Sequence, residues 1–234
     1  MKTVSNTIIK LGIGLPAYGA KISMWHAQMW LTLGAALAQS SNRFELRMLG
    51  YVDACGVDVA RNRLVADALE RDCDWLLMVD ADTWTDDGAS LLQMISDADR
   101  YRRGPGLAAA VVAAAVPRRD PDDTRPTVYR RVPALSRDVA DCTRTAFAYT
   151  PVAVSGDQLV SVDSVGAALM ALNLSFFRTL PPPWFAFKWL TGDTTPFRSE
   201  DHVLCERAKD LGWEVLVDPR VDACHLQRPV VTRR

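Results

Sequence analysis

The sequence predicts an α/β fold in which a mostly parallel, mixed sheet is flanked by helices. Short apolar runs typical of strands alternate with segments whose apolar residues recur at the 3.6-residue period of a helix. Strands separated by helices of this length pair in parallel through right-handed crossovers. The chain is 49% hydrophobic and 24% charged, which is the composition of an ordinary globular protein with a full-sized core.

The first half of the chain carries this alternation most clearly. Pro16 and Gly19 end the first strand. Asp86 and Asp87 lie where a helix begins, since acidic side chains are favourable at a helix N-terminus. We expect strands at residues 8–15, 44–49, 75–79 and 107–116, and helices at residues 25–38, 59–71 and 86–95.

The composition changes between residues 117 and 157, where seven arginines are mixed with aspartates and prolines. We expect an irregular, exposed insertion or hairpin here. Because acidic residues nearly cancel the basic ones, a solvated surface is favoured, although nucleic-acid binding by residues 118–144 stays open. Beyond this region we expect strands at 159–163, 165–172 and 214–217, and a helix at 200–211 that ends at Gly212.

Charge and cysteine content argue against several kinds of protein. A net charge of −1 gives no general attraction to nucleic acid or to an anionic membrane. The longest uncharged apolar run, residues 107–116, is about half the length of a membrane span, so we expect no transmembrane segment. An odd number of widely spaced cysteines argues against a disulfide framework and against a cysteine zinc site. We expect buried thiols and a cytoplasmic location; the cysteines are Cys55, Cys73, Cys142, Cys205 and Cys224.

Two aspartates, Asp80 and Asp82, directly follow the apolar run of residues 75–79. A buried strand delivers its C-terminal end to the sheet edge where open α/β folds keep their ligand sites. Carboxylates there suit Mg²⁺ or Mn²⁺, with substrate phosphates completing the coordination. A solvated turn at the strand end is the alternative, since aspartate is common in turns.

Four features follow one another along the chain, and together they resemble the GT-A fold glycosyltransferases. They are a Pro-Ala-Tyr-Gly turn at residues 16–19, Ala-Arg-Asn at 60–62, Asp-x-Asp at 80–82, and Ser-Glu-Asp at 199–201 followed by His225. The resemblance spans residues 8–226. It is strongest to the short, soluble members of the inverting family 2 group, including those of bacteriophages, for which the location is the host cytoplasm.

The resemblance implies one GT-A domain over residues 1–234. Its Rossmann-like, nucleotide-sugar-binding half is expected at about residues 1–116, and its acceptor-side half at about residues 117–234. The implied activity is transfer of a sugar from a UDP- or GDP-sugar to a hydroxyl acceptor. Surface polysaccharide, a small molecule, a protein and a modified DNA base all stay open as acceptors, and so does the oligomeric state.

Mn²⁺ or Mg²⁺ is the implied cofactor, because a divalent ion can neutralise the departing diphosphate without proton transfer. By the resemblance Asp82 is the direct carboxylate ligand, and Asp80 binds through water or contacts the ribose. His225 is the implied third ligand, because several GT-A enzymes place a histidine after the last strand. The alternative for His225 is an ordinary hydrogen-bonded or surface histidine.

Asp201 is the implied catalytic base, and Glu200 is expected to orient the acceptor. An inverting transfer needs a carboxylate that deprotonates the attacking hydroxyl. The alternative is that both residues only complement the dipole of the helix that they begin. The sequence does not fix the stereochemical outcome.

The nucleotide is expected to bind in a pocket lined by Pro16, Ala17 and Tyr18, with the Tyr18 ring available for stacking. Asp53, after the second strand, matches the position where the family often uses an acid to hold the nucleobase.

Four further residues are assigned to the donor by the resemblance. Arg61 is expected to pair with a phosphate or with Asp80, and Asn62 to orient the same group. Gly166 would let the donor sugar approach the backbone. Trp184 would stack on a sugar face, with a core or lid position as the alternative.

Two rival interpretations stay open. Residues 79–83 also fit the Asp-x-Asp-x-Thr signature of haloacid-dehalogenase-like phosphatases, but that strand normally lies near the N-terminus, whereas about 75 residues precede it here. The second rival is a catalytically inactive relative that binds a nucleotide or a carbohydrate.

Overall fold

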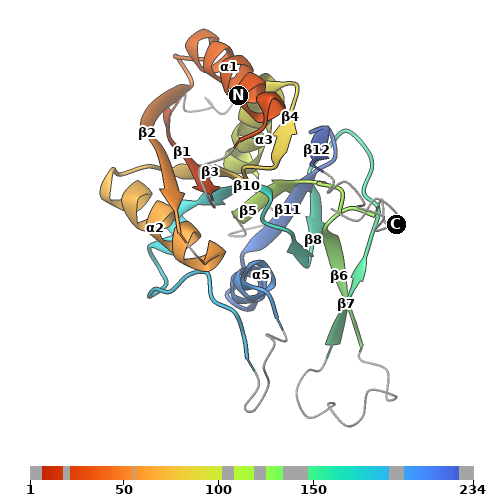
Figure 1. Ribbon diagram of the computed structural model, residues 1–234. Helices are drawn as coiled ribbons and strands as arrows, with labels where there is room; N and C mark the ends of the chain where they lie inside the picture. Colours follow the sequence, from red (N-terminus) through yellow and green to blue (C-terminus); the bar gives the residue numbers. More distant parts are fainter. Residues whose placement is uncertain are drawn as a thin grey trace, which may run out of the picture.

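The computed structural model describes residues 7–17, 22–54, 56–101, 108–118, 125–133, 147–189 and 198–226. Its centre is a seven-stranded sheet with the order β2-β1-β3-β10-β5-β11-β8 (Figure 1). The strands are, in that order, β2 (Phe44–Asp53), β1 (Ile9–Ala17), β3 (Trp75–Val79), β10 (Leu169–Asn173), β5 (Ala109–Ala114), β11 (Glu214–Asp218) and β8 (Val160–Val162).

Helices cover both faces of this sheet, and each face has its own hydrophobic core (Figure 1). On one face lie α1 (Met24–Gln39) and α3 (Gly88–Arg100), on the other α2 (Val57–Glu70) and α5 (Glu200–Asp210), with the short α4 (Leu174–Phe177). Side chains of β3 alternate between the cores, so that Leu76 and Met78 belong to the α2 side and Leu77 to the α1 side. This three-layer arrangement confirms the α/β prediction.

The sheet is mixed, with three parallel and three antiparallel pairings. The pairings β1–β2, β1–β3 and β5–β11 are parallel, as the strand–helix alternation predicts. By contrast, β10 lies antiparallel between β3 and β5. A fully buried strand is apolar in either direction, so the sequence pattern at residues 165–172 does not reveal this reversal.

The reversal brings the N-terminal end of β10 to the edge where the parallel strands end. Ala17 and Asp53, the last residues of β1 and β2, are paired there. Asp80 follows β3, and its N–H donates to the carbonyl of Ala168 at 2.8 Å. This edge therefore holds Asp53 and Asp80, two of the acidic residues singled out above.

The close packing of α1 against α3 depends on Gly88. A Cβ at Gly88 would lie 2.3 Å from the backbone nitrogen of Leu33, so the two helices are closer here than any side chain would allow. The packing of α1 on α3 thus explains why residue 88 is a glycine.

Two small sheets complete the fold. β4 (Thr83–Thr85) pairs antiparallel with β12 (Ala223–His225). β6 (Val128–Pro133) lies between β7 (Phe147–Pro151) and β9 (Ser164–Val165). The antiparallel β6–β7 pair agrees with the hairpin alternative for residues 117–157, whereas β4, β9 and β12 are too short for a sequence pattern.

Two further predictions concern the thiols and the membrane. Cys73 and Cys205 are buried as predicted, Cys224 is half-buried, and Cys55 and Cys142 lie outside the described residues. Burial raises the pKa of Cys205 to about 12. Within the described ranges, no helix is long and apolar enough to cross a membrane.

Candidate active site

The centre of the candidate site is a buried arginine. Arg61, on the first turns of α2, is 3% exposed. Its Nη2 donates to both carboxylate oxygens of Asp80, at 2.9 and 3.1 Å, and its Nη1 donates to Glu200. Its Cζ also lies 5.9 Å from the ring centroid of Phe185. One guanidinium therefore joins the end of β3 to the start of α5, and its contact with Asp80 is one of the two partners expected for Arg61.

The charges in this cluster do not balance. Burial opposes the charge of Arg61, but Asp80 and Glu200 together raise the pKa of its guanidinium, so it stays charged. Burial raises the pKa of Glu200 to about 7, and nearby Asp201 adds to the rise, while Arg61 opposes it. Arg61 therefore pairs with Asp80 as a charged guanidinium, and Glu200 is the carboxyl group whose pKa burial brings close to neutral pH.

Asp82 lies beside His225, as the resemblance implies. The β4–β12 pairing places His225 opposite Thr83, and the Leu226 N–H donates to the Asp82 carbonyl at 2.8 Å. The Nε2 atom of His225 is 3.5 Å from Oδ1 of Asp82. The short β4–β12 sheet thus joins two side chains that are far apart in the sequence.

The orientation of His225 suits a metal ligand. Its Nδ1 lies 3.0 Å from the carbonyl of Pro117, which can only accept, so Nδ1 carries a proton. In the neutral ring, the lone pair of Nε2 then faces the Asp82 carboxylate, so a cation between them would contact both side chains. Neighbouring ligands of an octahedral Mg²⁺ lie about 3 Å apart, close to this spacing.

The described residues contain no group of three or more His, Cys, Asp or Glu side chains that could hold a metal ion. Asp80 is occupied by Arg61, which leaves Asp82 and His225 as a pair of ligands. Mg²⁺ and Mn²⁺ sites commonly use one or two protein ligands and complete their shell with water and substrate phosphates. The pair therefore fits a divalent ion that is shared with a phosphorylated ligand.

His26 is a residue that the sequence interpretation missed. It lies on the first turn of α1, is fully buried, and its Nδ1 is 2.7 Å from the carbonyl of Thr83. Burial lowers its pKa, so the ring is neutral at pH 7 and holds the turn after Asp82 without adding charge. A histidine on the buried face of an otherwise uncharged helix was the available signal.

Asp201 lies in the first turn of α5, next to Glu200. Its Oδ1 accepts hydrogen bonds from the Ser199 hydroxyl and, at 2.8 Å, from the His202 N–H. Among the described residues, both of these hydrogen bonds to Asp201 are accepted by Oδ1. Asp201 is half-buried while Glu200 is 5% exposed, so Asp201 is the more accessible carboxylate of the pair.

A second cluster that the sequence did not reveal fixes the β6–β7 hairpin to α5. The His202 ring stacks on Tyr149 with centroids 4.4 Å apart, and its edge meets Tyr129. Its Nδ1 contacts the hydroxyl of Ser164, while Arg198 lies over the other ring of the stack, 5.0 Å from the Tyr149 centroid. These contacts position the helix that carries Glu200 and Asp201.

Asn62 and Trp184 contact each other. The Asn62 amide donates to the Phe185 carbonyl at 2.7 Å and accepts from the N–H groups of Trp184 and Phe185. The indole N–H of Trp184 donates to the carbonyls of Phe177 and Leu180, and the residue is 8% exposed. Asn62 thus fixes a loop beside the site, and Trp184 occupies the core position that was its alternative.

The expected nucleotide residues are partly described. Pro16 and Ala17 pair with Val52 and Asp53 at the ends of β1 and β2, which brings three of the expected contacts together. Tyr18 lies outside the described residues.

The structure gives Gly166 a packing reason. A Cβ there would lie 2.8 Å from the side chain of Thr127, whose carbonyl accepts the Gly166 N–H at 2.7 Å. This close contact requires glycine whether or not a sugar approaches the same backbone.

Comparison with known proteins settles the fold. No family model and no curated protein matches the chain. Among solved structures, A197 from STIV is 14% identical, with a TM-score of 0.51 over 97% of this chain and 98% of that one. GalNAc-T7, in a structure with UDP, GalNAc and Mn²⁺, is 11% identical, with a TM-score of 0.54 over 96% of this chain and 45% of that one. The chain has the GT-A fold.

The GT-A fold agrees with the sequence resemblance and gives the site its context. In this GT-A chain the Asp80–Asp82 segment follows β3, and the Glu200–Asp201 pair begins α5. Both reach the same sheet edge, because Arg61 contacts Asp80 and Glu200 at once. At identities this low the likeness establishes the fold, and the chemistry of the site is argued from the residues.

Replacing Glu200 by glutamine should change how stability depends on pH. Folding raises the pKa of Glu200 from 4.5 to about 7, so the folded protein holds a proton that the unfolded chain has released. The stabilisation by this group is complete below pH 4.5 and is lost as the pH rises through about 7. Relative to the glutamine variant, the free energy of unfolding of the wild type should fall by up to about 3 kcal/mol over this window.

Urea unfolding of both proteins across the window measures this difference. Glu45→Gln, at an exposed site on β2, controls for loss of a carboxylate. Parallel pH profiles for the wild type and the Glu200→Gln variant would contradict the assignment.

Proposed function

We propose that the protein is a metal-dependent glycosyltransferase that moves a sugar from a nucleotide diphosphate donor to a hydroxyl acceptor. The observation that carries this proposal is that two neighbouring aspartates have different contacts. Asp80 is held by Arg61, while Asp82 faces Nε2 of His225 at 3.5 Å. The GT-A fold supports the same function, because its neighbour GalNAc-T7 is seen with UDP, GalNAc and Mn²⁺.

Asp82 and His225 would hold the divalent ion, Mn²⁺ or Mg²⁺. When bound, the ion supplies Lewis-acid stabilisation of the charge that develops on the departing diphosphate. The contact between His225 Nδ1 and the Pro117 carbonyl keeps Nε2 on the side of Asp82, where it would hold the ion, and His26 holds the turn that follows Asp82. Arg61 lies close enough to Asp80 to keep that carboxylate from competing for the ion.

The nucleoside would bind where β1 and β2 end. Pro16 and Ala17 supply apolar contact, Tyr18 a ring for stacking, and Asp53 a carboxylate for a nucleobase N–H. Asp53 lies beside the apolar residues of this pocket, since it pairs with Ala17. UDP-sugars are the first donors to test and GDP-sugars the second.

Asp201 would act as the base. In an inverting transfer the acceptor oxygen attacks the anomeric carbon, its proton passes to the Asp201 carboxylate, and the bond to the diphosphate oxygen breaks. Glu200, with a pKa of about 7, would orient the acceptor and adjust the charge of the cluster as the diphosphate leaves.

The acceptor would lie in a groove between α2 and the loop that follows α4. The groove has a volume of about 780 Å³, and its lining includes Val59, Arg63, Phe187 and Trp189. Trp189 is 53% exposed, and an exposed indole commonly stacks on the apolar face of a sugar. Phe185 lines this groove and its ring centroid lies 5.9 Å from the Cζ of Arg61, so the groove borders the site.

The phosphatase alternative is less consistent with this geometry. It requires the first aspartate of the Asp-x-Asp motif as the nucleophile. Both oxygens of Asp80 accept hydrogen bonds from the buried Arg61, which lowers the nucleophilicity of a carboxylate. An inactive relative that keeps nucleotide binding is distinguished by the experiments below.

Asp82→Asn should abolish metal-dependent nucleotide binding. Loss of a charged ligand from a site with two protein ligands should weaken Mn²⁺-dependent UDP or GDP binding by about 100-fold or more. Titration calorimetry with and without Mn²⁺ measures this. Asp86→Asn, an exposed carboxylate on the same segment, should bind like the wild type. Binding that needs no metal, or that survives in Asp82→Asn, would refute the metal site.

Asp201→Asn should spare nucleotide binding and remove transfer. Losing a general base typically lowers the rate by about 10²- to 10⁴-fold. Thermal shift with Mn²⁺ and a panel of nucleotide sugars first identifies the donor. Release of the nucleoside diphosphate over a panel of acceptors then measures transfer. Asp210→Asn, on the same helix and 72% exposed at its side chain, is the matched control. Undiminished transfer in Asp201→Asn would show that another group is the base.

A further inference from the structure

Helix α1 presents an apolar face to the outside of the molecule. None of its 16 residues is Asp, Glu, Lys or Arg. Its inner face is the buried one, with Met29 and Leu33 in the core. On the opposite side Met24 is 77% exposed and Leu31 is 76% exposed. A surface helix normally carries charged residues on its outer face, so this face is unusual for a helix exposed to water.

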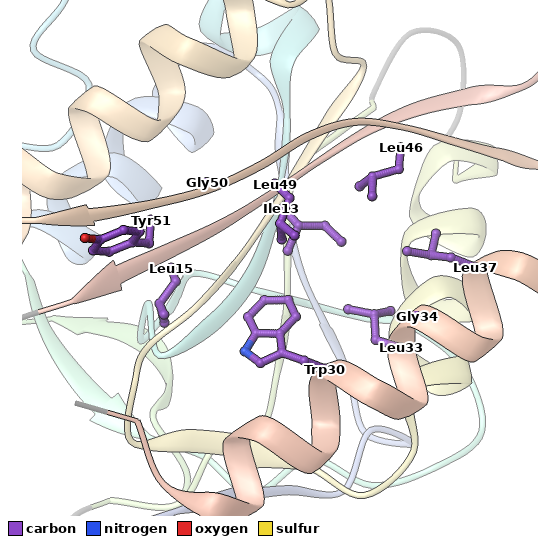
Figure 2. A pocket seen from close by; sticks show the side chains of 10 residues that line it. All are labelled: Ile13, Leu15, Trp30, Leu33, Gly34, Leu37, Leu46, Leu49, Gly50 and Tyr51. Carbon is purple, nitrogen blue, oxygen red and sulfur yellow. The ribbon is translucent and has the colours of Figure 1, made fainter. Parts of the chain in front are cut away.

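An apolar pocket lies beside this face, between α1 and the edge strand β2. It has a volume of about 350 Å³, and its lining is formed largely by Trp30, Gly34, Leu37, Leu46, Leu49 and Tyr51 (Figure 2). Leu49 is 71% exposed and Tyr51 is 63% exposed. In Figure 2 the helix and strand side chains project toward one another without filling the space between them.

Among the described residues, no contact explains why residue 34 is a glycine. A Cβ at Gly34 would meet no described atom within 4 Å, whereas one at Gly88 would lie 2.3 Å from the Leu33 backbone. Glycine is among the least favourable residues in a helix interior, so its presence calls for a compensating contact. Gly88 has that contact inside the chain. A compensating contact for Gly34 would lie outside the described part of the chain.

We propose that a second copy of this chain packs on this face, with the two α1 helices crossing at Gly34 about a two-fold axis. Two antiparallel helices that cross at Gly34 place Leu31 of each opposite the partner's Leu37. Leu37 lines the pocket, so the exposed Leu31 side chain of each copy enters the pocket of the other. Absence of a side chain at Gly34 lets the two backbones approach closely enough for this insertion.

The face is self-complementary, which favours a second copy over other occupants. A two-fold interface must match itself, and here the projecting Leu31 and the pocket-lining Leu37 lie three residues before and three residues after Gly34 on one helix. Without charged residues, α1 lacks the cationic side chains by which interfacial helices bind anionic membranes. A 16-residue helix is about 24 Å long, and a standard interface buries about 800 Å² per partner, so the β2 edge would have to contribute beside α1.

Sedimentation velocity of the full chain across the micromolar range tests the proposal. The wild type should sediment as a dimer. Leu31→Arg places a charge at the centre of the interface and should give a monomer. Gly34→Leu should also give a monomer, because the added side chain fits the open space of one copy but blocks the crossing. Far-ultraviolet circular dichroism should show both variants folded.

Leu211→Arg, which adds the same charge to a 54% exposed leucine at the end of α5, should remain a dimer. A monomeric wild type would overturn the proposal, whether or not it binds neutral or anionic lipid vesicles. Dimers in both Leu31→Arg and Gly34→Leu would overturn it as well. The proposal does not depend on the proposed activity, since none of these variants alters a residue of the candidate active site.

Discussion

The site depends on one buried ion pair network, in which Arg61 contacts Asp80 and Glu200 at once. Three elements of the fold meet there, because α2 supplies the arginine, the end of β3 the aspartate and the start of α5 the glutamate. Taking these charges out of water is costly unless each is paired, so removing the arginine would leave two carboxylates uncompensated. Arg61 therefore sets both the position of α5 and the charge of the sheet edge.

The network also explains why two aspartates so close in sequence have different roles. Asp80 is neutralised by Arg61, while Asp82 lies next to His225 through the β4–β12 pairing. In the function proposed above, the chain keeps one carboxylate for its own stability and uses the other to bind a cation. Glu200, whose pKa is about 7, can take up or release a proton as the charge of a bound ligand changes. Hydrogen bonds to backbone carbonyls orient the two histidines: His225 contacts Pro117 and His26 contacts Thr83.

Sequence patterns predicted the features that depend on local chemistry. The apolar run before Asp80 predicted β3 with its observed bounds, and the Ser-Glu-Asp segment predicted the start of α5. The direction of β10 was not predictable, since a buried strand has no directional signal. The tyrosine–histidine stack around His202 was missed because it joins distant segments by side chains that are unremarkable locally. For Gly166 and Asn62 the sequence placed the residues near the site, while only the structure showed that each has a packing contact of its own.

A crystal grown with Mn²⁺ and UDP would test the central claim most directly, through an anomalous difference map at the manganese edge. The account predicts one peak within about 2.2 Å of both an Asp82 oxygen and Nε2 of His225, with Arg61 still bound to Asp80. Manganese bound to Asp80 after displacement of Arg61, or no peak at this edge of the sheet, would contradict it.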